Sequence, residues 1–340
     1  MSEVVTVGVD IAKNVFHVHA VDAAGRLVLQ KQLRRSKVVE FFSNLAPCRV
    51  AMEACGSAHF WAREISKFGH AVQLIPPAYV KPFVKRQKND AVDAEAICEA
   101  AQRPNMRFVP IKSEDQQGNA LVFRARDLLT RQRIQIINSL RSHMAEFGIV
   151  VGQGPAQLPE LLLHITEPDS GLPECAKPVL QVLVDTLAAL QAQIKGLDEE
   201  INRRAREDEM ARRLATVPGV GPITATALVA LAPNAANFRR ARDFAAWLGL
   251  TPLEHSTGGK QRLGATSKMG ERTLRRLLIL GACATVQHRA KHLSKDTWLG
   301  KMLARKPRML VIVALANKMA RIVWALIVKG GNYRVSEAVA

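Results

Sequence analysis

The sequence predicts an α/β domain followed by a long all-α region. Short β-rich runs joined by turns fill the first part of the chain, whereas beyond residue 113 the apolar residues recur at the three- and four-residue spacing of helices. At 340 residues the chain exceeds a usual single domain. Shifts in composition and pattern predict three domains, at residues 1–112, 113–209 and 210–340.

The elements of the first domain predict a mixed sheet. Three β-rich runs joined by short turns form an antiparallel meander at 4–10, 15–22 and 27–33. Next come a helix at about 36–46, a strand at 49–54, a helix at about 57–68, a strand at 71–75 and an Ala-rich helix at about 89–102. Hairpin strands followed by alternating helices and strands predict helices on both faces of the sheet. This order is typical of the ribonuclease-H-like fold.

The middle domain is predicted to be two long helices. Apolar stripes run through residues 113–147 and 176–206, and a spacer with two Gly and two Pro at 150–159 separates them. Residues 113–209 hold ten basic against 15 acidic side chains. Two such helices predict an antiparallel coiled-coil arm that dimerises, with an ordinary helical bundle as the alternative.

The charge of the last domain predicts a polyanionic partner. Residues 210–340 hold 22 basic against five acidic side chains and so supply nearly all of the net charge of +18. Nucleic acid is the favoured partner, and an anionic membrane surface is the alternative. The apolar run at 309–328 is broken by Asn317, Lys318 and Arg321, which favours a buried helix over a membrane span. With no signal peptide and no paired cysteine motif, a cytoplasmic protein without zinc is expected.

Four carboxylates of the first domain are candidate metal ligands: Asp10, Glu53, Asp90 and Asp93. Asp10 and Glu53 lie in apolar strands, where an unpaired charge is costly, and the other two share one helix face at i and i+3. Together they would hold two Mg²⁺ ions roughly 4 Å apart at a phosphodiester. Read singly, each has a structural alternative, such as a strand cap or a helix N-terminus. The run VGVDIAK also resembles the phosphate loop of actin-like ATPases and sugar kinases, but the later Gly-rich loops of those proteins are not found in 113–209.

Two motifs of the last domain are candidate phosphate sites. TVPGVGPITATALVAL resembles a helix–hairpin–helix, with Gly219 and Gly221 in the turn, although it could serve only as a packing corner. LEHSTGGKQRLG places hydroxyls beside a Gly pair that favours a turn. The candidate phosphate ligands around it are basic: Lys260, Arg262, Lys268, Arg272, Arg275 and Arg276. Ser256 could attack a phosphate with help from His255, or could merely donate a hydrogen bond.

Taken together, the four carboxylates, the PGVGP turn and GLTPLEHSTGGKQRLGATSKMGERTLRRLLILGA resemble the insertion sequence 110 family of transposases, and more closely its STGGK-loop branch. The resemblance covers essentially the whole chain. It implies a RuvC-like DEDD nuclease domain, a coiled-coil arm and a transposase domain with a catalytic serine. It also implies a covalent serine–DNA intermediate, Mg²⁺ at the tetrad, a dimer or tetramer acting on donor and target DNA at the nucleoid, and a structured guide RNA (the bridge RNA).

Carried over to this chain, the tetrad is Asp10, Glu53, Asp90 and Asp93, and the nucleophile is Ser256, with Thr257 as its rival. Two other functions stay open at this stage: a metal-only nuclease or Holliday-junction resolvase, and a non-catalytic nucleic-acid-binding protein. A tyrosine recombinase is disfavoured because the chain has only two tyrosines, Tyr79 and Tyr333.

Overall fold

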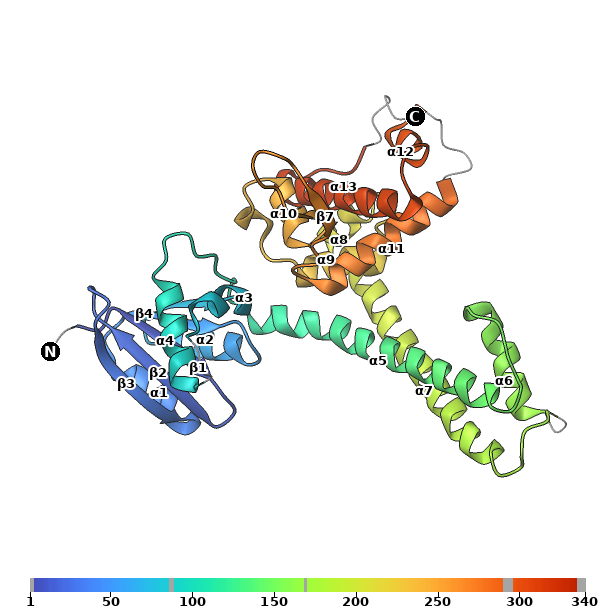
Figure 1. The fold of residues 1–340 in the computed structure, drawn as a ribbon, viewed down its shortest axis with the longest axis horizontal. Coiled ribbons are helices and arrows are strands. Elements are labelled where there is room, and N and C mark those ends of the chain that lie inside the picture. Colours follow the sequence, from blue (N-terminus) through green and yellow to red (C-terminus); the bar gives the residue numbers. More distant parts are fainter. Residues whose placement is uncertain (1–2, 86–88, 168–169, 290–295, 335–340) are drawn as a thin grey trace. The chain divides into compact units, whose positions relative to one another are not determined.

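The chain forms two compact units, Met1–Gln117 and Gly118–Ala340, and each is described by itself. The structure is a computed structural model that describes residues 3–85, 89–167, 170–289 and 296–334. Figure 1 shows strands and short helices in the first unit and helices of very different length in the second. The division into three functional domains stays a prediction.

The first unit is built on a five-stranded mixed sheet, as the sequence predicts. The strands are β1 (Thr6–Ile11), β2 (Val15–Val21), β3 (Leu27–Arg34), β4 (Arg49–Glu53) and β5 (Ala71–Ile75). They lie in the order β3-β2-β1-β4-β5. The first three strands form the antiparallel meander, and β4 pairs parallel to both β1 and β5. The parallel pairing puts the carboxyl ends of β1 and β4 side by side at one edge of the sheet.

Helices cover both faces of this sheet (Figure 1). One face packs on α1 (Val38–Ser43) and α2 (Ala58–Ser66), and its core includes Val7, Val9, Val50 and Met52. Strand residues between these point to the other face, where α4 (Asp90–Ala101) lies. The short helices α3 (Pro77–Val80), η1 (Arg35–Lys37) and η2 (Lys81–Phe83) complete the unit.

Gly8 sets how closely α4 approaches the sheet. A Cβ atom at this position would lie 2.2 Å from the Ala94 carbonyl oxygen and 2.6 Å from the Cys98 amide nitrogen. Only glycine leaves room for helix backbone at that distance. Helix α4 is therefore held against β1 at Ala94 and Cys98, opposite a strand position two residues from Asp10.

Two long helices follow: α5 (Glu114–Ala145), which starts in the last residues of the first unit and continues in the second, and α7 (Lys177–Glu207) in the second unit. The sequence does not predict η3 (Pro155–Gln157) and α6 (Leu158–Thr166), which follow α5. Leu140 and Met144 of α5, Leu161 of α6, and Leu180 and Leu187 of α7 share one small core. Helical structure in this region is confirmed, and the coiled coil stays a prediction.

The remaining helices, apart from the short η4, share a larger core. They are α8 (Glu209–Leu214), α9 (Pro222–Leu231), η4 (Ala235–Asn237), α10 (Ala241–Trp247), α11 (Arg272–Arg289), α12 (Trp298–Leu303) and α13 (Arg308–Lys329). The sequence predicts all but α8, η4 and α12. Helix α13 is long and apolar enough to cross a membrane by length and composition. Its buried side chains, among them Val311, Ala316 and Val323, belong to this core, as expected of a buried helix.

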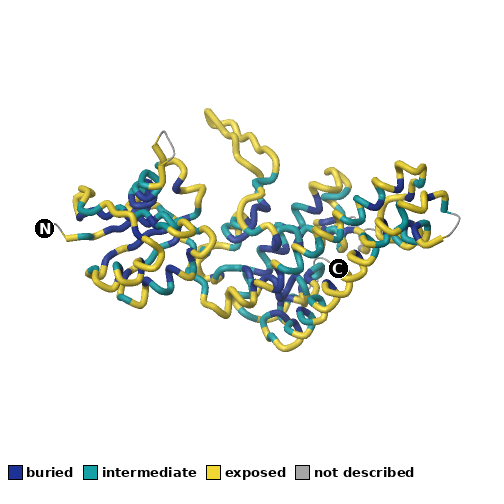
Figure 2. Tube along the Cα trace, turned by 90° about the horizontal axis from the view of Figure 1, so that it is seen from below, coloured by how far each residue is buried: buried dark blue, intermediate teal, exposed yellow. Residues whose placement is uncertain are grey.

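A hairpin interrupts the helices of the second unit between α10 and α11. Its strands β6 (Pro252–Glu254) and β7 (Leu263–Thr266) pair antiparallel around the STGGK turn. Residues 252–265 are all exposed, which Figure 2 draws in yellow. The sequence predicts only a loop here, whereas in the structure two short paired strands close that loop.

Candidate catalytic carboxylates and serine hairpin

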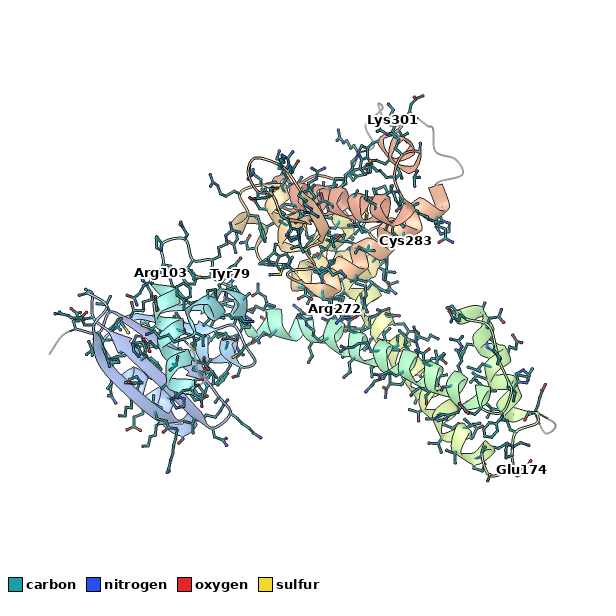
Figure 3. All side chains as sticks on the ribbon, viewed as in Figure 1. Tyr79, Arg103, Glu174, Arg272, Cys283 and Lys301 are labelled. Carbon is teal, nitrogen blue, oxygen red and sulfur yellow. The ribbon has the colours of Figure 1, made fainter. Side chains whose placement is uncertain are left out.

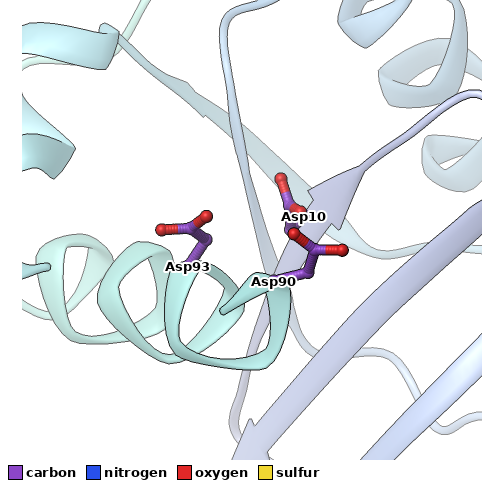
Figure 4. A group of neighbouring side chains, drawn as sticks. All are labelled: Asp10, Asp90 and Asp93. Atoms are coloured by element: carbon purple, nitrogen blue, oxygen red, sulfur yellow. The ribbon is translucent and has the colours of Figure 1, made fainter. Parts of the chain in front are cut away.

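Three of the four predicted metal ligands come together on the α4 face of the sheet. Asp10 near the end of β1 lies beside Asp90 and Asp93 in the first turn of α4 (Figure 4). One carboxylate oxygen of each lies within 4.8 Å of those of the other two. Val7 and Val9 belong to the opposite core, so the alternation of β1 directs Asp10 toward α4.

Local sequence fixes where the two helical aspartates stand. Asn89 caps α4, and its side-chain oxygen accepts a hydrogen bond of 3.1 Å from the Ala91 amide. The helix therefore begins at Asp90, and Asp93 follows three residues later on the same face, still in the first turn. Gly8 then allows this turn to approach β1 closely enough for the three carboxylates to meet.

Glu53, the fourth predicted ligand, lies beside this group but is not part of its closest set. Glu53 is the last residue of β4. The residue before it, Met52, pairs with Val9 of the neighbouring strand β1. Burial raises the pKa of Glu53, and the negative charges of Asp10 and Asp93 raise it further. Its charge is therefore coupled to the cluster, although its oxygens are not among the three that approach within 4.8 Å.

The cluster is electrostatically crowded. Burial is the largest cause of the raised pKa of Asp10, followed by the charges of Asp93 and Asp90. A bound cation would offset this repulsion, and carboxylate oxygens are the donors that Mg²⁺ and Mn²⁺ prefer. The residues thus fit a divalent metal ion.

A histidine that the sequence analysis overlooks faces the same cluster. His17 of β2 pairs with Asp10 across the antiparallel ladder, and its Nδ1 lies 3.9 Å from an Asp90 oxygen. That nitrogen is buried and, among the described residues, has no hydrogen-bond partner. The predicted antiparallel meander could have identified this histidine, because the register of β1 and β2 puts His17 opposite Asp10.

Ser256 is held by two hydrogen bonds in the exposed hairpin. Its hydroxyl donates to a carboxylate oxygen of Glu254 at 2.9 Å, and the Arg262 amide donates to the same hydroxyl oxygen at 3.2 Å. Thr257, the rival nucleophile, closes the turn through its backbone, which exchanges hydrogen bonds with Lys260. Gly258 and Gly259 have φ values of +56° and +74°, which allow the turn.

His255 occupies the other side of the hairpin strand. Its amide donates to the Arg262 carbonyl, and a Cβ atom at Gly264 would lie 2.9 Å from the His255 ring. The imidazole thus lies against Gly264. Contrary to our suggestion for His255, the side chain that Ser256 contacts is Glu254.

The predicted phosphate ligands fall into two groups. Lys260, Arg262 and Lys268 are exposed, and Arg272 begins α11 (Figure 3). By contrast, Arg275 donates to the Leu248 and Met269 carbonyls, and Arg276 forms an ion pair with Asp127 of α5. Burial, together with the nearby charge of Arg272, lowers the pKa of Arg275.

The glycines of the PGVGP turn have different surroundings. Gly219, with φ +85°, packs against α11, where a Cβ atom would lie 2.7 Å from the Gly281 carbonyl oxygen. Gly221 precedes α9, and nothing lies within 4 Å of a Cβ built there. Of these two glycines, Gly219 is therefore packed against protein, whereas the space beside Gly221 is open.

Comparison with known proteins gives matches over the whole chain. Residues 211–297 match the transposase IS116/IS110/IS902 family, and residues 7–149 match a transposase family of the IS110 DEDD type. A "Probable family 20 transposase" of Pseudomonas aeruginosa is 49% identical over 96% of this chain and 98% of its own length. The transposase for insertion sequence element IS1328 of Yersinia enterocolitica is 40% identical over 97% of this chain and 98% of its own length. The transposase for insertion sequence element IS1111A of Coxiella burnetii is 38% identical over 98% of this chain and 92% of its own length.

Proposed function

The chain belongs to the IS116/IS110/IS902 family of transposases, and we propose that it exchanges DNA strands through a covalent link between Ser256 and a DNA phosphate. Its substrate is DNA, and the reaction is phosphoryl transfer. We further propose that Asp10, Glu53, Asp90 and Asp93 bind Mg²⁺ in this reaction.

The observation that carries the proposal is the anchored hydroxyl of Ser256. Two hydrogen bonds fix its oxygen, while the residue stays exposed at the surface of the hairpin. A nucleophile needs both properties, because it must be oriented and must reach a large substrate. Thr257 lends its backbone to the turn, so Ser256 is the better candidate.

The basic side chains around the hairpin bind the DNA backbone. Lys260, Arg262 and Lys268 are exposed and can each contact a phosphate, and Arg272 at the start of α11 can stabilise the charge that develops during attack. Arg275 and Arg276 contribute by holding α11 in place, since both already contact protein groups. Gly221, with open space before α9, is a further backbone contact for DNA, and Gly219 shapes its turn.

The carboxylates would hold the metal through oxygen atoms of Asp10, Asp90 and Asp93, with Glu53 beside them. A bound divalent cation supplies positive charge to a phosphodiester undergoing displacement. The chain's own part is to keep these oxygens close at the end of β1, through the Asn89 cap and the close approach at Gly8.

The resemblance supports two partners in addition to DNA. A guide RNA would direct target and donor choice by base pairing, and the basic excess of residues 210–340 fits a second polyanion. A homodimer or homotetramer would form through a coiled-coil arm. Leu121, Leu128, Val179 and Val182 on α5 and α7 are between 48% and 66% exposed, and such apolar positions favour burial against a second copy.

A nicked suicide substrate tests the serine mechanism. With Mg²⁺ present, the wild-type chain should accumulate a protein–DNA adduct, Ser256→Ala should form none, and Thr257→Val should retain it. Asp10→Asn and Asp93→Asn should lose cleavage while still binding DNA. Normal cleavage by Ser256→Ala without an adduct would instead identify a metal-only nuclease or junction resolvase. Sequencing of RNA that copurifies with the chain, expressed with its flanking DNA, tests the guide.

A further inference from the structure

We infer that Glu254 is the general base that accepts the proton of Ser256 when the hydroxyl attacks DNA. This inference rests on the proposed serine mechanism and names the group that the mechanism requires. Glu254 is the last residue of β6, and its carboxylate oxygen lies 2.9 Å from the Ser256 hydroxyl oxygen. A general base must lie within hydrogen-bond reach of the proton it removes, and this distance satisfies the requirement.

The hydrogen-bond pattern fixes the direction of that proton. The Arg262 amide donates to the hydroxyl oxygen of Ser256 and so occupies one of its lone pairs. An ionised carboxylate only accepts hydrogen bonds, so the hydroxyl hydrogen must point toward Glu254. A second lone pair of the serine oxygen remains for attack on phosphorus.

The hairpin geometry explains why Glu254, and not its neighbour, has this role. Backbone pairing continues past β6, because the His255 amide donates to the Arg262 carbonyl. Residues two apart on such extended backbone lie on the same side, so Glu254 shares a side with Ser256 while His255 faces Gly264. Backbone pairing of β6 with β7, including Glu254 with Leu263, holds the carboxylate in this position.

The charge of Glu254 is unfavourable for DNA binding. It is one of five acidic residues in 210–340, and it lies in the same hairpin as Lys260 and Arg262. A carboxylate there repels a phosphate, whereas glutamine would not. A base therefore has a distinctive signature at this position: its removal should slow the reaction without weakening DNA binding.

The Ser256 oxygen forms a bond to phosphorus, the bond from phosphorus to a deoxyribose oxygen breaks, the serine proton passes to Glu254, and the leaving oxygen takes a proton from solvent. In the second transfer a deoxyribose hydroxyl attacks the phosphoserine and releases its proton to solvent. Glu254 then returns its proton to the departing serine oxygen, as microscopic reversibility requires.

The test measures adduct formation on the nicked substrate in single-turnover conditions, alongside DNA affinity at low salt. Glu254→Gln should slow adduct formation about 100-fold and bind DNA equally tightly or about twofold more tightly. Glu199→Gln on α7 removes the same charge outside the hairpin and should change neither quantity. Retained DNA affinity also shows that the hairpin of the variant is folded.

A thiol nucleophile separates base catalysis from positioning. Cysteine ionises by itself at mildly alkaline pH, so in a Ser256→Cys background the Glu254→Gln change should cost less than about tenfold. An equal loss in the rate of adduct formation with the serine and with the cysteine nucleophile would overturn the role of Glu254 as base. Adduct formation by Glu254→Gln at the wild-type rate would also overturn it while leaving the serine mechanism intact. A wild-type adduct that persists in Ser256→Ala would refute the serine mechanism itself.

Discussion

Gly8→Ala should damage the carboxylate cluster without touching any carboxylate. The added methyl group would lie 2.2 Å from the Ala94 carbonyl oxygen, 2.6 Å from the Cys98 amide nitrogen and 2.7 Å from the Cys98 Cβ. Ordinary contacts begin at 3.4 Å. Two of the three atoms belong to helix backbone, so no side-chain rotation relieves the overlap, and α4 must move from β1 by about 1 Å.

The cost follows from the packing on both sides of the contact. Ala94 and Cys98 are each 1% exposed, and β1 is the central strand of the sheet. Overpacking of such a core costs typically about 1–3 kcal/mol, and the backbone contacts put this variant near the upper end. Because α4 carries Asp90 and Asp93, the same movement should weaken binding of a divalent cation at least about tenfold.

Hydrogen exchange of β1 peptides, followed by mass spectrometry, reports the stability of the first unit alone. Mn²⁺ titration followed by electron paramagnetic resonance reports the metal site. Gly56→Ala is the matched control, because nothing lies within 4 Å of a Cβ built there, and it should change stability by less than about 1 kcal/mol. Equal exchange rates and equal Mn²⁺ affinity in the two variants would refute the close packing of α4 on β1.

Three further predictions concern other charged groups. Asp127→Ala should destabilise the second unit by about 2 kcal/mol in urea unfolding, since Thr273 and Arg276 lose their acceptor, whereas exposed Asp185→Ala should not. With EDTA present to remove metal ions, Asp10→Asn should unfold at a higher temperature than the wild-type protein. The difference in unfolding temperature should grow from low pH to neutral pH. The pKa of Asp10 is raised in the folded state, so its stabilising proton is lost as the pH rises; a constant margin would contradict this. Lys260→Ala should lower the slope of log affinity against log salt for DNA by about one, and Lys195→Ala on α7 should leave it unchanged.

The sheet and the long helices could be predicted because their signals are local. Strand alternation, turn residues and helical periodicity identify β1 to β5, α5 and α7 within a few residues of their ends. The hairpin of β6 and β7 carries no such signal, since its residues are exposed and its strands span three and four residues. Backbone pairing alone defines it, and the contact between Ser256 and Glu254 depends on that pairing.

For the carboxylates, the sequence predicts which residues gather but not the distances between their oxygen atoms. The i, i+3 spacing of Asp90 and Asp93 and the strand position of Asp10 predict their convergence, which the structure contains. The presence of His17 beside Asp10 follows from the register of β1 and β2. The exclusion of Glu53 from the closest set does not, because the register of β1 and β4 puts Glu53 directly after the Val9–Met52 pair, beside Asp10. Register is a tertiary property that a single strand does not encode.

The arginines of α11 show the same limit and change where DNA is expected to bind. Helical spacing puts Arg272, Arg275 and Arg276 on one face, and a shared face predicts a phosphate site only if that face meets solvent. Arg272 is exposed, whereas Arg275 and Arg276 meet protein, because Arg275 donates to two carbonyls and Arg276 pairs with Asp127. Drawing these guanidinium groups toward a phosphate would break contacts that anchor α11. Of the six predicted phosphate ligands, the exposed ones are therefore Lys260, Arg262, Lys268 and Arg272, and the first two lie in the hairpin with the Ser256 hydroxyl, the proposed nucleophile.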